Sequence, residues 1–391
     1  MQKAFILFLF KGVGAIASLV LGMLISKYYG LDVLGQYGLF LSYILIFSTV
    51  ATWGGGIYVI ENQEEKININ NFLFNTVFAF IVGLISVLFF YVKFNLFYVG
   101  GIVFIYSFLM YKSSVFMING LQYYNALVDD LLKYFIPVII LLFYAGYFNF
   151  FEIFFLAQVV LFLISIFLFF RLISFNICEI SFYNWKDSFC YGILPTVSAL
   201  LILLNAQFDR IILSYTVSKE MLGVYFAAQT VMALVTYITV SVMMVITPTL
   251  IKLYKEKSYL ELKMLSRKYS ILLFLLSFSI LFFAIFFGKY FLKLYGINSI
   301  EGYNTLLVLL SGVATSQLFG FGMTIYAYTV HKKRLIIYQL FVFILASVLC
   351  LIFSKLYGIV GAAFSTAFGF ILIKVLVWLD FRKKGIQVGV I

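Results

Sequence analysis

Residues Ser26–Tyr37 read SKYYGLDVLGQY, and residues Ser214–Tyr225 read SYTVSKEMLGVY. At a constant offset of 188 positions, the two stretches share the first serine, a Leu-Gly pair and the last tyrosine. Each stretch lies between two long apolar runs, so each is expected to join the first and second helices of one half of the chain. Self-similarity at a single spacing is typical of membrane folds built from two related halves.

The composition places the chain in a lipid bilayer. Of its 391 residues, 64% are hydrophobic and only 11% are charged, whereas ordinary soluble domains carry about 25% charged residues. Its 3 Pro and 3 Cys exclude a proline-rich disordered chain and a disulfide scaffold. The net charge of +12 is better explained by loops that face the cytoplasm than by nucleic-acid binding.

Apolar runs of membrane-spanning length recur along the whole sequence. A helix needs about 20 apolar residues to cross the hydrocarbon core. The runs predict an all-α polytopic membrane protein with twelve transmembrane helices, at residues 4–26, 35–58, 72–92, 97–118, 123–145, 152–170, 189–214, 222–250, 269–288, 303–328, 335–354 and 358–380. They form two blocks of six, which predicts an N-terminal lobe over residues 1–188 and a C-terminal lobe over residues 189–391.

Basic residues set the predicted topology. With the N-terminus in the cytoplasm, the segments on that side carry 16 Lys and Arg side chains, and the opposite side carries 6: Lys27, Lys93, Lys219, Lys289, Lys293 and Lys355. The positive-inside rule therefore predicts that both termini are cytoplasmic. Because each lobe has an even number of helices, the two lobes are expected to share one orientation, related by a pseudo-two-fold axis along the membrane normal.

Three further stretches carry a family resemblance. Asp209–Ser214 followed by Leu222–Ala228 contains Asp-x-x-x-Leu-Ser, a short polar loop, Leu-Gly-x-Tyr and small residues. Tyr357–Ala363 precedes the last predicted helix, and Lys332–Arg334 lies between the tenth and eleventh. With the length and helix count of the whole chain, these features resemble the polysaccharide repeat-unit flippases (Wzx-type O-antigen transporters) of the multidrug/oligosaccharidyl-lipid/polysaccharide (MOP) exporter superfamily.

The resemblance implies a MATE-like fold of two six-helix lobes around a central, often cationic cavity. It also implies that the chain moves undecaprenyl-diphosphate-linked oligosaccharides from the cytoplasmic to the periplasmic leaflet of the bacterial inner membrane. The implied partners are this lipid-linked oligosaccharide, membrane lipids, and a polysaccharide polymerase with its chain-length regulator. No enzymatic activity, cofactor, metal or nucleic acid is expected.

Ionisable residues inside the predicted spans are candidate site residues, because each costs about 2.5–3.5 kcal/mol in the bilayer. Lys11, Lys112, Lys133 and Lys374 fall toward the cytoplasmic half of their helices. They are expected either to line a cavity that attracts a diphosphate or to extend to the lipid headgroups. Arg210 is a fifth basic residue within the spans, and it falls toward the outer half.

Three carboxylates are candidates for coupling or gating. Asp129 and Asp130 precede Lys133 by four and three residues, a spacing that predicts ion pairing within one helix. Asp209 and Arg210 are adjacent and point to different sides of a helix, so their partners are expected on other helices or in water. Asp209 matches the Asp of the family motif and is interpreted as an ion-coupling carboxylate or as a latch between lobes.

Prolines and small residues mark expected bends and close helix contacts. Pro137, Pro195 and Pro248 fall inside predicted spans, where a proline interrupts the hydrogen-bond ladder, so they are hinge candidates. Gly54–Gly56, near the end of the second span, is a similar weak point. A row of small residues on the first span allows close approach of another helix: Gly14, Ser18, Gly22 and Ser26. Uncharged polar residues inside spans are candidates for sugar contacts: Asn205, Gln207, Gln229, Gln317 and Tyr326.

Three alternative functions are considered. A cation-coupled multidrug exporter of the same superfamily would favour acidic residues in its cavity, whereas the spans here hold five basic and three acidic residues. A membrane-embedded polysaccharide polymerase or ligase would carry a large outer loop. A major-facilitator transporter would carry a Gly- and Arg-rich loop where Glu61–Lys66 stands. No P-loop, HExxH or nucleophile-elbow motif occurs.

Overall fold

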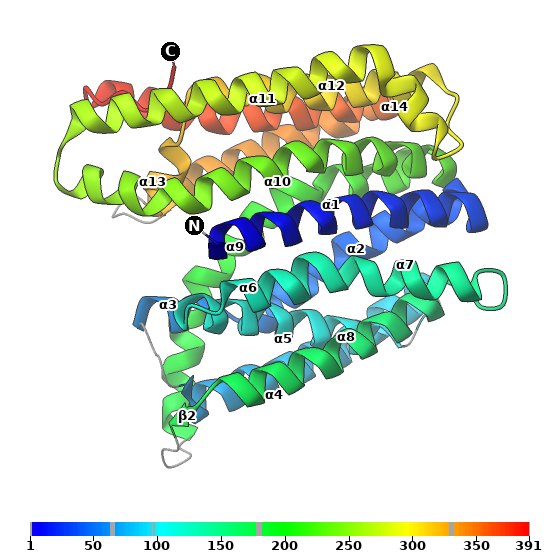
Figure 1. Ribbon diagram of the computed structural model, residues 1–391, viewed down its shortest axis with the longest axis horizontal. Helices are drawn as coiled ribbons and strands as arrows, with labels where there is room; N and C mark the ends of the chain where they lie inside the picture. The colour runs from blue at the N-terminus through cyan, green and yellow to red at the C-terminus, as the bar shows by residue number, and fades with distance from the viewer. Residues whose placement is uncertain are drawn as a thin grey trace. The chain divides into compact units, whose positions relative to one another are not determined.

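The computed structural model describes residues 2–62, 67–94, 96, 98–176, 182–327 and 332–390, so most of the Glu61–Lys66 loop lies outside it. Two strands of two residues each, β1 (Ile67–Asn68) and β2 (Phe175–Asn176), pair in parallel beside the helices. Within the described ranges, nine helices are long and apolar enough to cross a membrane. The prediction of a helical, multi-pass membrane protein is therefore confirmed (Figure 1).

The helices follow one another with short connections. In the N-terminal half they are α1 (Gln2–Tyr29), α2 (Leu31–Thr52), α3 (Gly55–Asn62), α4 (Ile69–Phe94), α5 (Val99–Ile118), α6 (Gln122–Asn125), the π-helix Ala126–Leu132, α7 (Lys133–Tyr144) and α8 (Phe150–Leu172). In the C-terminal half they are α9 (Phe182–Thr216), α10 (Lys219–Lys255), α11 (Tyr259–Lys293), α12 (Ile300–Ser316), the 3-10 turn Gln317–Phe319, α13 (Gly322–Ala327) and α14 (Lys332–Lys383).

The chain divides into two compact units. The first unit contains residues 1–24 and 40–203, and the second contains residues 25–39 and 204–391. In the first unit, α4 packs against α5, and α8 packs against both α5 and α7. In the second unit, α12 packs against α10, α11 and α14. The predicted lobe boundary at residue 188 falls inside α9, which contributes residues to both units.

Several helices end at other residues than the predicted spans do, because glycines interrupt or redirect them. The span predicted at 35–58 stops at Thr52, where Trp53 and Gly54 adopt φ of 41° and 69° and a short helix follows. The span predicted at 303–328 divides at Gly320, which has φ of 76°. The last two predicted spans run on as α14, with a kink at Gly358, where φ is 59° and ψ is −138°.

The segment predicted as one span at 123–145 contains a π-helical turn. Residues Ala126–Leu132 wind as a π-helix between α6 and α7. Pro137 lies five residues beyond this turn and cannot donate a hydrogen bond to the carbonyl of Lys133. π-Helical turns are rare and lie frequently at functional sites, and this one carries Asp129 and Asp130.

The two related stretches meet in the second unit. Both connect consecutive helices, α1 to α2 and α9 to α10, as the repeat predicts. A Cβ added to Gly35 would lie 2.4 Å from the Lys219 carbonyl oxygen, and one added to Gly223 would lie 2.0 Å from that of Leu31. At the offset of 188 positions Gly35 corresponds to Gly223 and Leu31 to Lys219, so the two contacts are equivalent.

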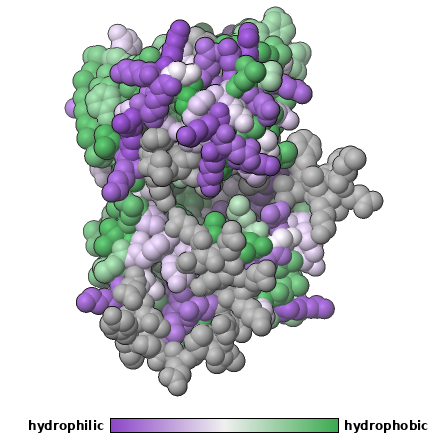
Figure 2. All heavy atoms as spheres, turned by 90° about the vertical axis from the view of Figure 1, so that its left-hand side faces the viewer, coloured by the Kyte–Doolittle hydropathy of each residue, from purple (hydrophilic) through white to green (hydrophobic). Residues whose placement is uncertain are grey.

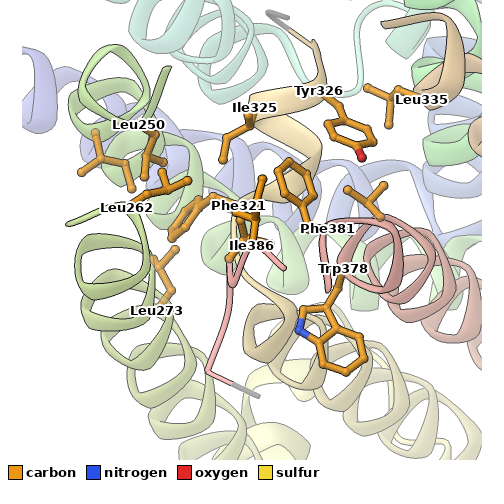
Figure 3. Close-up of a cluster of buried hydrophobic side chains, with 13 residues drawn as sticks. Leu250, Leu262, Leu273, Phe321, Ile325, Tyr326, Leu335, Trp378, Phe381 and Ile386 are labelled. Atoms are coloured by element: carbon orange, nitrogen blue, oxygen red, sulfur yellow. The ribbon is translucent and has the colours of Figure 1, made fainter. Parts of the chain in front are cut away.

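A hydrophobic cluster closes one end of the second unit (Figure 3). Leu250 and Leu262 come from α10 and α11, Ile325 from α13, and Phe381 from α14. The segment after α14 joins this cluster, because Val388 is fully buried and its carbonyl oxygen accepts hydrogen bonds from the Phe321 amide and the Ser266 hydroxyl. The C-terminal segment thus ties α11 to the turn before α13.

Basic side chains gather at the end of the second unit where α10 ends and α11 begins. Figure 2 faces this end and shows hydrophilic side chains on the second unit there. The exposed basic residues there include Lys252, Lys255, Lys257, Arg267, Lys268, Arg382, Lys383 and Lys384. Large apolar side chains are exposed along the flanks of α4, α8 and α11, as expected for helices in contact with lipid.

Candidate functional site

In the first unit, the candidate residues of three helices come together. Lys112 of α5 is fully buried, and its ammonium donates to Asp129 Oδ1 over 2.8 Å. A charge at this depth needs a partner, because removing an ammonium from water costs several kcal/mol (about 2.5–3.5 on the insertion scale). The bond joins α5 to the π-helix and orients the Asp129 carboxylate.

Lys11 of α1 contacts the second carboxylate of the π-helix. Its Nζ lies 4.0 Å from Asp130 Oδ2, and the side chain is buried. Close by, a Cβ added to Gly14 would lie 1.9 Å from the Asp130 carbonyl oxygen. The small-residue face predicted on the first span therefore provides a close approach, between α1 and the π-helix.

Lys133 is placed differently from the prediction. Its Nζ lies over the Tyr106 ring, 4.3 Å from the ring centroid. Within the described residues no carboxylate oxygen lies within 4.0 Å of it, and Asp129 and Asp130 instead pair with Lys112 and Lys11. The reason is that π-helical winding, with i→i+5 hydrogen bonds, alters the i, i+4 relation on which the predicted pair depends.

A cavity of about 250 Å³ opens beside this cluster. Its lining includes an ammonium, a carboxylate, a hydroxyl and an aromatic face, from Leu45, Tyr106, Leu109, Met110, Ser113, Asp129 and Lys133. The surrounding cluster has three lysines and two aspartates, so its formal charge is positive. The Lys133 ammonium shares the cavity wall with Asp129 but has no carboxylate oxygen within 4.0 Å among the described residues, so it is suited to an anionic group.

Asp209 lies in a polar network of the second unit. It is fully buried, and its Oδ2 accepts hydrogen bonds from Tyr225 Oη at 2.6 Å, Gln229 Nε2 at 2.6 Å and Thr366 Oγ1 at 3.0 Å. Tyr225 and Gln229 belong to α10, and Thr366 belongs to α14. The expectation that Asp209 has partners on other helices is confirmed, and the carboxylate joins α9, α10 and α14.

Arg210 is held by two glutamines. Its Nε donates to Gln229 Oε1, and its Nη1 donates to Gln207 Oε1 at 2.8 Å. The guanidinium also lies 4.8 Å from the centroid of the Phe226 ring. Because Gln229 bonds to Asp209 through its amide nitrogen and to Arg210 through its oxygen, it links the two adjacent charges.

Lys374 has a neutral partner. Its Nζ donates to Gln317 Oε1 at 3.1 Å, and Gln317 Nε2 donates in turn to Thr239 Oγ1 at 3.2 Å. Among the residues that the structure describes, no carboxylate oxygen lies within 4.0 Å of the Lys374 ammonium. Gln207, Gln229 and Gln317, which are candidates for sugar contacts, all serve here as partners of partly buried cations.

The three prolines lie inside helices, as predicted. Pro137 is in α7, Pro195 in α9 and Pro248 in α10. A Cβ added to Gly54 would lie 3.0 Å from the Cβ of Pro195, so the break between α2 and α3 packs directly on this part of α9. Their role as hinges stays a prediction.

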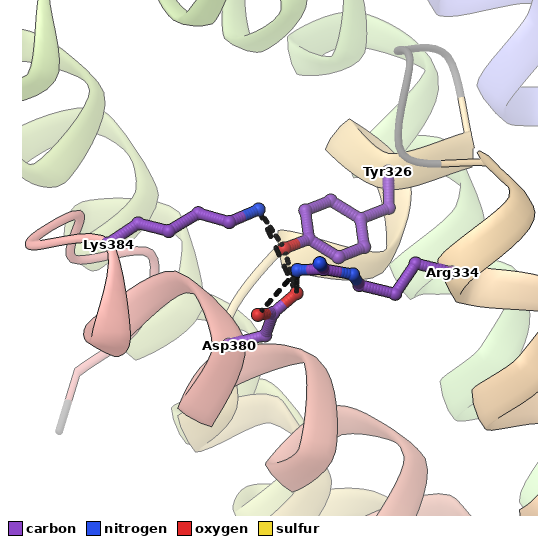
Figure 4. A network of polar contacts seen from close by, with 4 residues as sticks. All are labelled: Tyr326, Arg334, Asp380 and Lys384. Carbon is purple, nitrogen blue, oxygen red and sulfur yellow. Dashed lines mark hydrogen bonds and ion pairs between the residues drawn. The ribbon is translucent and has the colours of Figure 1, made fainter.

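A polar network that the sequence does not predict lies at the end of the second unit (Figure 4). Arg334 Nη1 donates to both carboxylate oxygens of Asp380, at 2.9 and 3.0 Å, and Tyr326 Oη donates to Asp380 Oδ2 at 2.5 Å. Lys384 donates to Tyr326 Oη at 2.9 Å, and partial burial lowers the pKa of its ammonium. The sequence signal is a single acid, Asp380, among basic residues at the ends of two spans.

Comparison with solved structures identifies proteins of similar fold. No protein-family model and no curated protein matches the chain. An inward-facing MATE-family multidrug resistance transporter of the MOP superfamily has a TM-score of 0.76 at 14% identity, covering 95% of this chain and 94% of that one. The lipid II flippase MurJ in an inward closed conformation has a TM-score of 0.71 at 15% identity, covering 97% and 87%. A Pyrococcus furiosus MOP transporter, described by a reversed polarity of its binding pocket, has a TM-score of 0.62 at 13% identity, covering 98% and 94%. The chain has the fold of MOP-superfamily transporters.

Proposed function

We propose that the chain is a polysaccharide repeat-unit flippase, which moves undecaprenyl-diphosphate-linked oligosaccharides from the cytoplasmic to the periplasmic leaflet of the bacterial inner membrane by alternating access. The observation that carries this proposal is the positively charged cluster of Lys11, Lys112 and Lys133 beside a cavity in the first unit. The similarity of the fold to a lipid II flippase supports a lipid-linked cargo.

In the proposed mechanism, Lys133 binds the diphosphate. Lys11 and Lys112 are engaged by carboxylates, whereas the Lys133 ammonium rests on an aromatic ring at the cavity wall. An anion entering the cavity gains a charge-assisted hydrogen bond from Lys133 without breaking an ion pair. Lys374 and Arg210, held by neutral glutamines, would offer further positive charge during translocation.

Removing the Lys133 charge tests this proposal. We expect Lys133→Gln to lower the rate at which repeat units reach the periplasmic face by about tenfold, the effect of losing one charge-assisted hydrogen bond. Lys133→Arg should restore most of the rate. The measurement is the sidedness of lipid-linked glycans in a host strain deleted for the gene and complemented with each variant at equal protein level.

Lys289 supplies a matched control. It is exposed, and its Nζ lies 5.1 Å from the centroid of the Tyr303 ring, an aromatic contact similar to that of Lys133. Lys289→Gln should leave transport unchanged. Normal glycan export in the deletion strain, accompanied by new drug sensitivity, would reject the flippase in favour of a cation-coupled multidrug exporter.

We also propose the full topology of twelve spans in two lobes, 1–188 and 189–391, with both termini in the cytoplasm. In the part of the chain that the structure describes, nine helices are long and apolar enough to cross a membrane, and three further helical stretches would bring the number of spans to twelve. They are α12, the continuous run Gln122–Tyr144, and the second part of α14 beyond Gly358. The exposed basic residues at the end of α10 support a cytoplasmic location for that end.

Cysteine labelling in intact cells tests the topology. In a variant whose natural cysteines are replaced by serine, Asn298→Cys should react with a membrane-impermeant maleimide, whereas Lys257→Cys should react only after the cells are opened. Asn298 lies between α11 and α12, and Lys257 lies between α10 and α11. The reverse pattern would place the termini outside the cytoplasm.

A further inference from the structure

A small polar pocket lies in the first unit where α2 breaks. It has a volume of about 20 Å³, and its polar lining comes from Thr52, Asn75, Thr76, Ser107 and Tyr111. Space for one small ion or one water needs at least about 10–15 Å³. The pocket is separate from the cavity beside Lys133, whose lining shares none of these residues.

Three of the four hydroxyl groups that line the pocket donate their protons to backbone carbonyls, the exception being that of Tyr111. Thr52 Oγ1 donates to the Ser48 carbonyl at 2.7 Å, and Thr76 Oγ1 donates to the Phe72 carbonyl at 2.8 Å. Ser107 Oγ donates to the Phe104 carbonyl at 2.7 Å. A hydroxyl has one proton and two acceptor sites, so these three oxygens retain only acceptor capacity for an occupant.

Asn75 adds an acceptor that has no partner. Its side chain is 5% exposed, and its Nδ2 donates to both the backbone oxygen and Oδ1 of Asn71, each at 2.8 Å. These two acceptors fix which end of the amide carries the nitrogen. Among the described residues, Asn75 Oδ1 has no hydrogen-bond donor, and a buried unsatisfied acceptor costs about 1–3 kcal/mol.

The break in α2 brings a helix C-terminus to the same place. Ala51 and Thr52 at the end of α2 line the pocket, and a helix C-terminus carries partial negative charge on its last carbonyl groups. The break is held in place, because Trp53 stacks on Phe189 with centroids 4.9 Å apart and donates from Nε1 to the Phe189 carbonyl at 2.9 Å. Gly55 permits the close packing of Asn75, since a Cβ there would lie 2.1 Å from Oδ1.

We propose that this pocket binds a sodium ion. Its polar groups offer oxygen acceptors and a helix C-terminus, which are the ligands of hard cations and of sodium sites at broken membrane helices. No carboxylate lines the pocket, and a site without a carboxylate suits a monovalent ion rather than calcium or magnesium. The inference does not depend on the identity of the transported cargo.

Direct binding of radioactive sodium to the purified full-length chain tests the proposal. In choline buffer, we expect saturable binding of ²²Na⁺ that unlabelled sodium displaces and an equal concentration of magnesium does not. Asn75→Leu should remove one bound ion per chain. Asn75→Asp should raise the affinity about tenfold, because a carboxylate adds a full charge at the same position.

A matched pair of serine variants separates ligand loss from a general effect. Ser107→Ala should weaken sodium binding about fivefold, the scale of one lost polar contact. Ser279→Ala removes an exposed hydroxyl that also donates to its own helix, over 2.8 Å to the Leu275 carbonyl, and should have no effect. Wild-type protein that binds no sodium, or Asn75→Leu and Asn75→Asp variants that both bind like wild type, would overturn the proposal and leave the pocket to water.

Discussion

Replacing Gly14 with alanine is expected to destabilise the first unit, whereas the same replacement at Gly12 should leave its stability unchanged. The added Cβ would lie 1.9 Å from the Asp130 carbonyl oxygen and 2.6 Å from its carbonyl carbon. Both are backbone atoms, so no side-chain rotation relieves the clash. The expected cost is about 3 kcal/mol, at the upper end of overpacking, and corresponds to a fall of about 10 °C in the unfolding midpoint.

Gly12 is a close control for this prediction. It lies on the same helix two residues earlier, and a Cβ added there meets nothing within 4 Å. The measurements are the yield of monodisperse protein in detergent and its thermal unfolding midpoint. Equal midpoints for the two alanine variants would contradict the close packing of α1 on the π-helix.

Replacing Asp209 with alanine is expected to give the second-largest loss of stability. The change leaves Tyr225 Oη, Gln229 Nε2 and Thr366 Oγ1 without their common acceptor inside the second unit. Each buried donor left unsatisfied costs about 1–3 kcal/mol, so a total of about 3 kcal/mol is expected. Thermal unfolding in detergent measures the loss.

Two further variants show what the Asp209 carboxylate does. Asp32 is exposed in the first turn of α2, so Asp32→Ala should cost less than about 1 kcal/mol. Asp209→Asn keeps the size of the side chain and one acceptor oxygen, so its unfolding midpoint should lie between those of the wild type and of Asp209→Ala. An Asp209→Ala variant as stable as wild type would contradict the role of this carboxylate in joining α9, α10 and α14. A stable Asp209→Asn variant without transport would favour a coupling role.

The candidate charges illustrate how far sequence reasoning reaches. That Lys11, Lys112 and Asp209 lie inside helices follows from their positions in apolar runs, whereas only the structure shows that they are buried. Their partners do not follow, because the partner of a buried charge depends on how each helix is rotated about its axis. The predicted pairing of Lys133 within its helix fails because a π-helical turn, which carries no simple sequence signature, precedes it.

The proposed sodium pocket shows a second limit to what the sequence predicts. No metal is expected from the sequence, because its three cysteines and single histidine form no metal-ligand pattern. A site of neutral oxygens leaves no such pattern: Thr52, Asn75 and Ser107 come from three different helices. The Gly54–Gly56 stretch predicts a weak point in the second span, but only the structure shows that the break there ends beside an unpaired Asn75 oxygen.

The amino-acid sequence alone determined that this protein is a helical membrane protein, and which charges lie inside its helices. These properties follow from hydrophobicity and length, which add up locally along the chain. Tertiary structure decided that Asp129 pairs with Lys112, that Gly35 meets Gly223, and that Lys133 is left facing a cavity. The physical reason is that ion pairs, backbone contacts and cavities depend on distances of a few ångströms between helices, and helix packing sets those distances.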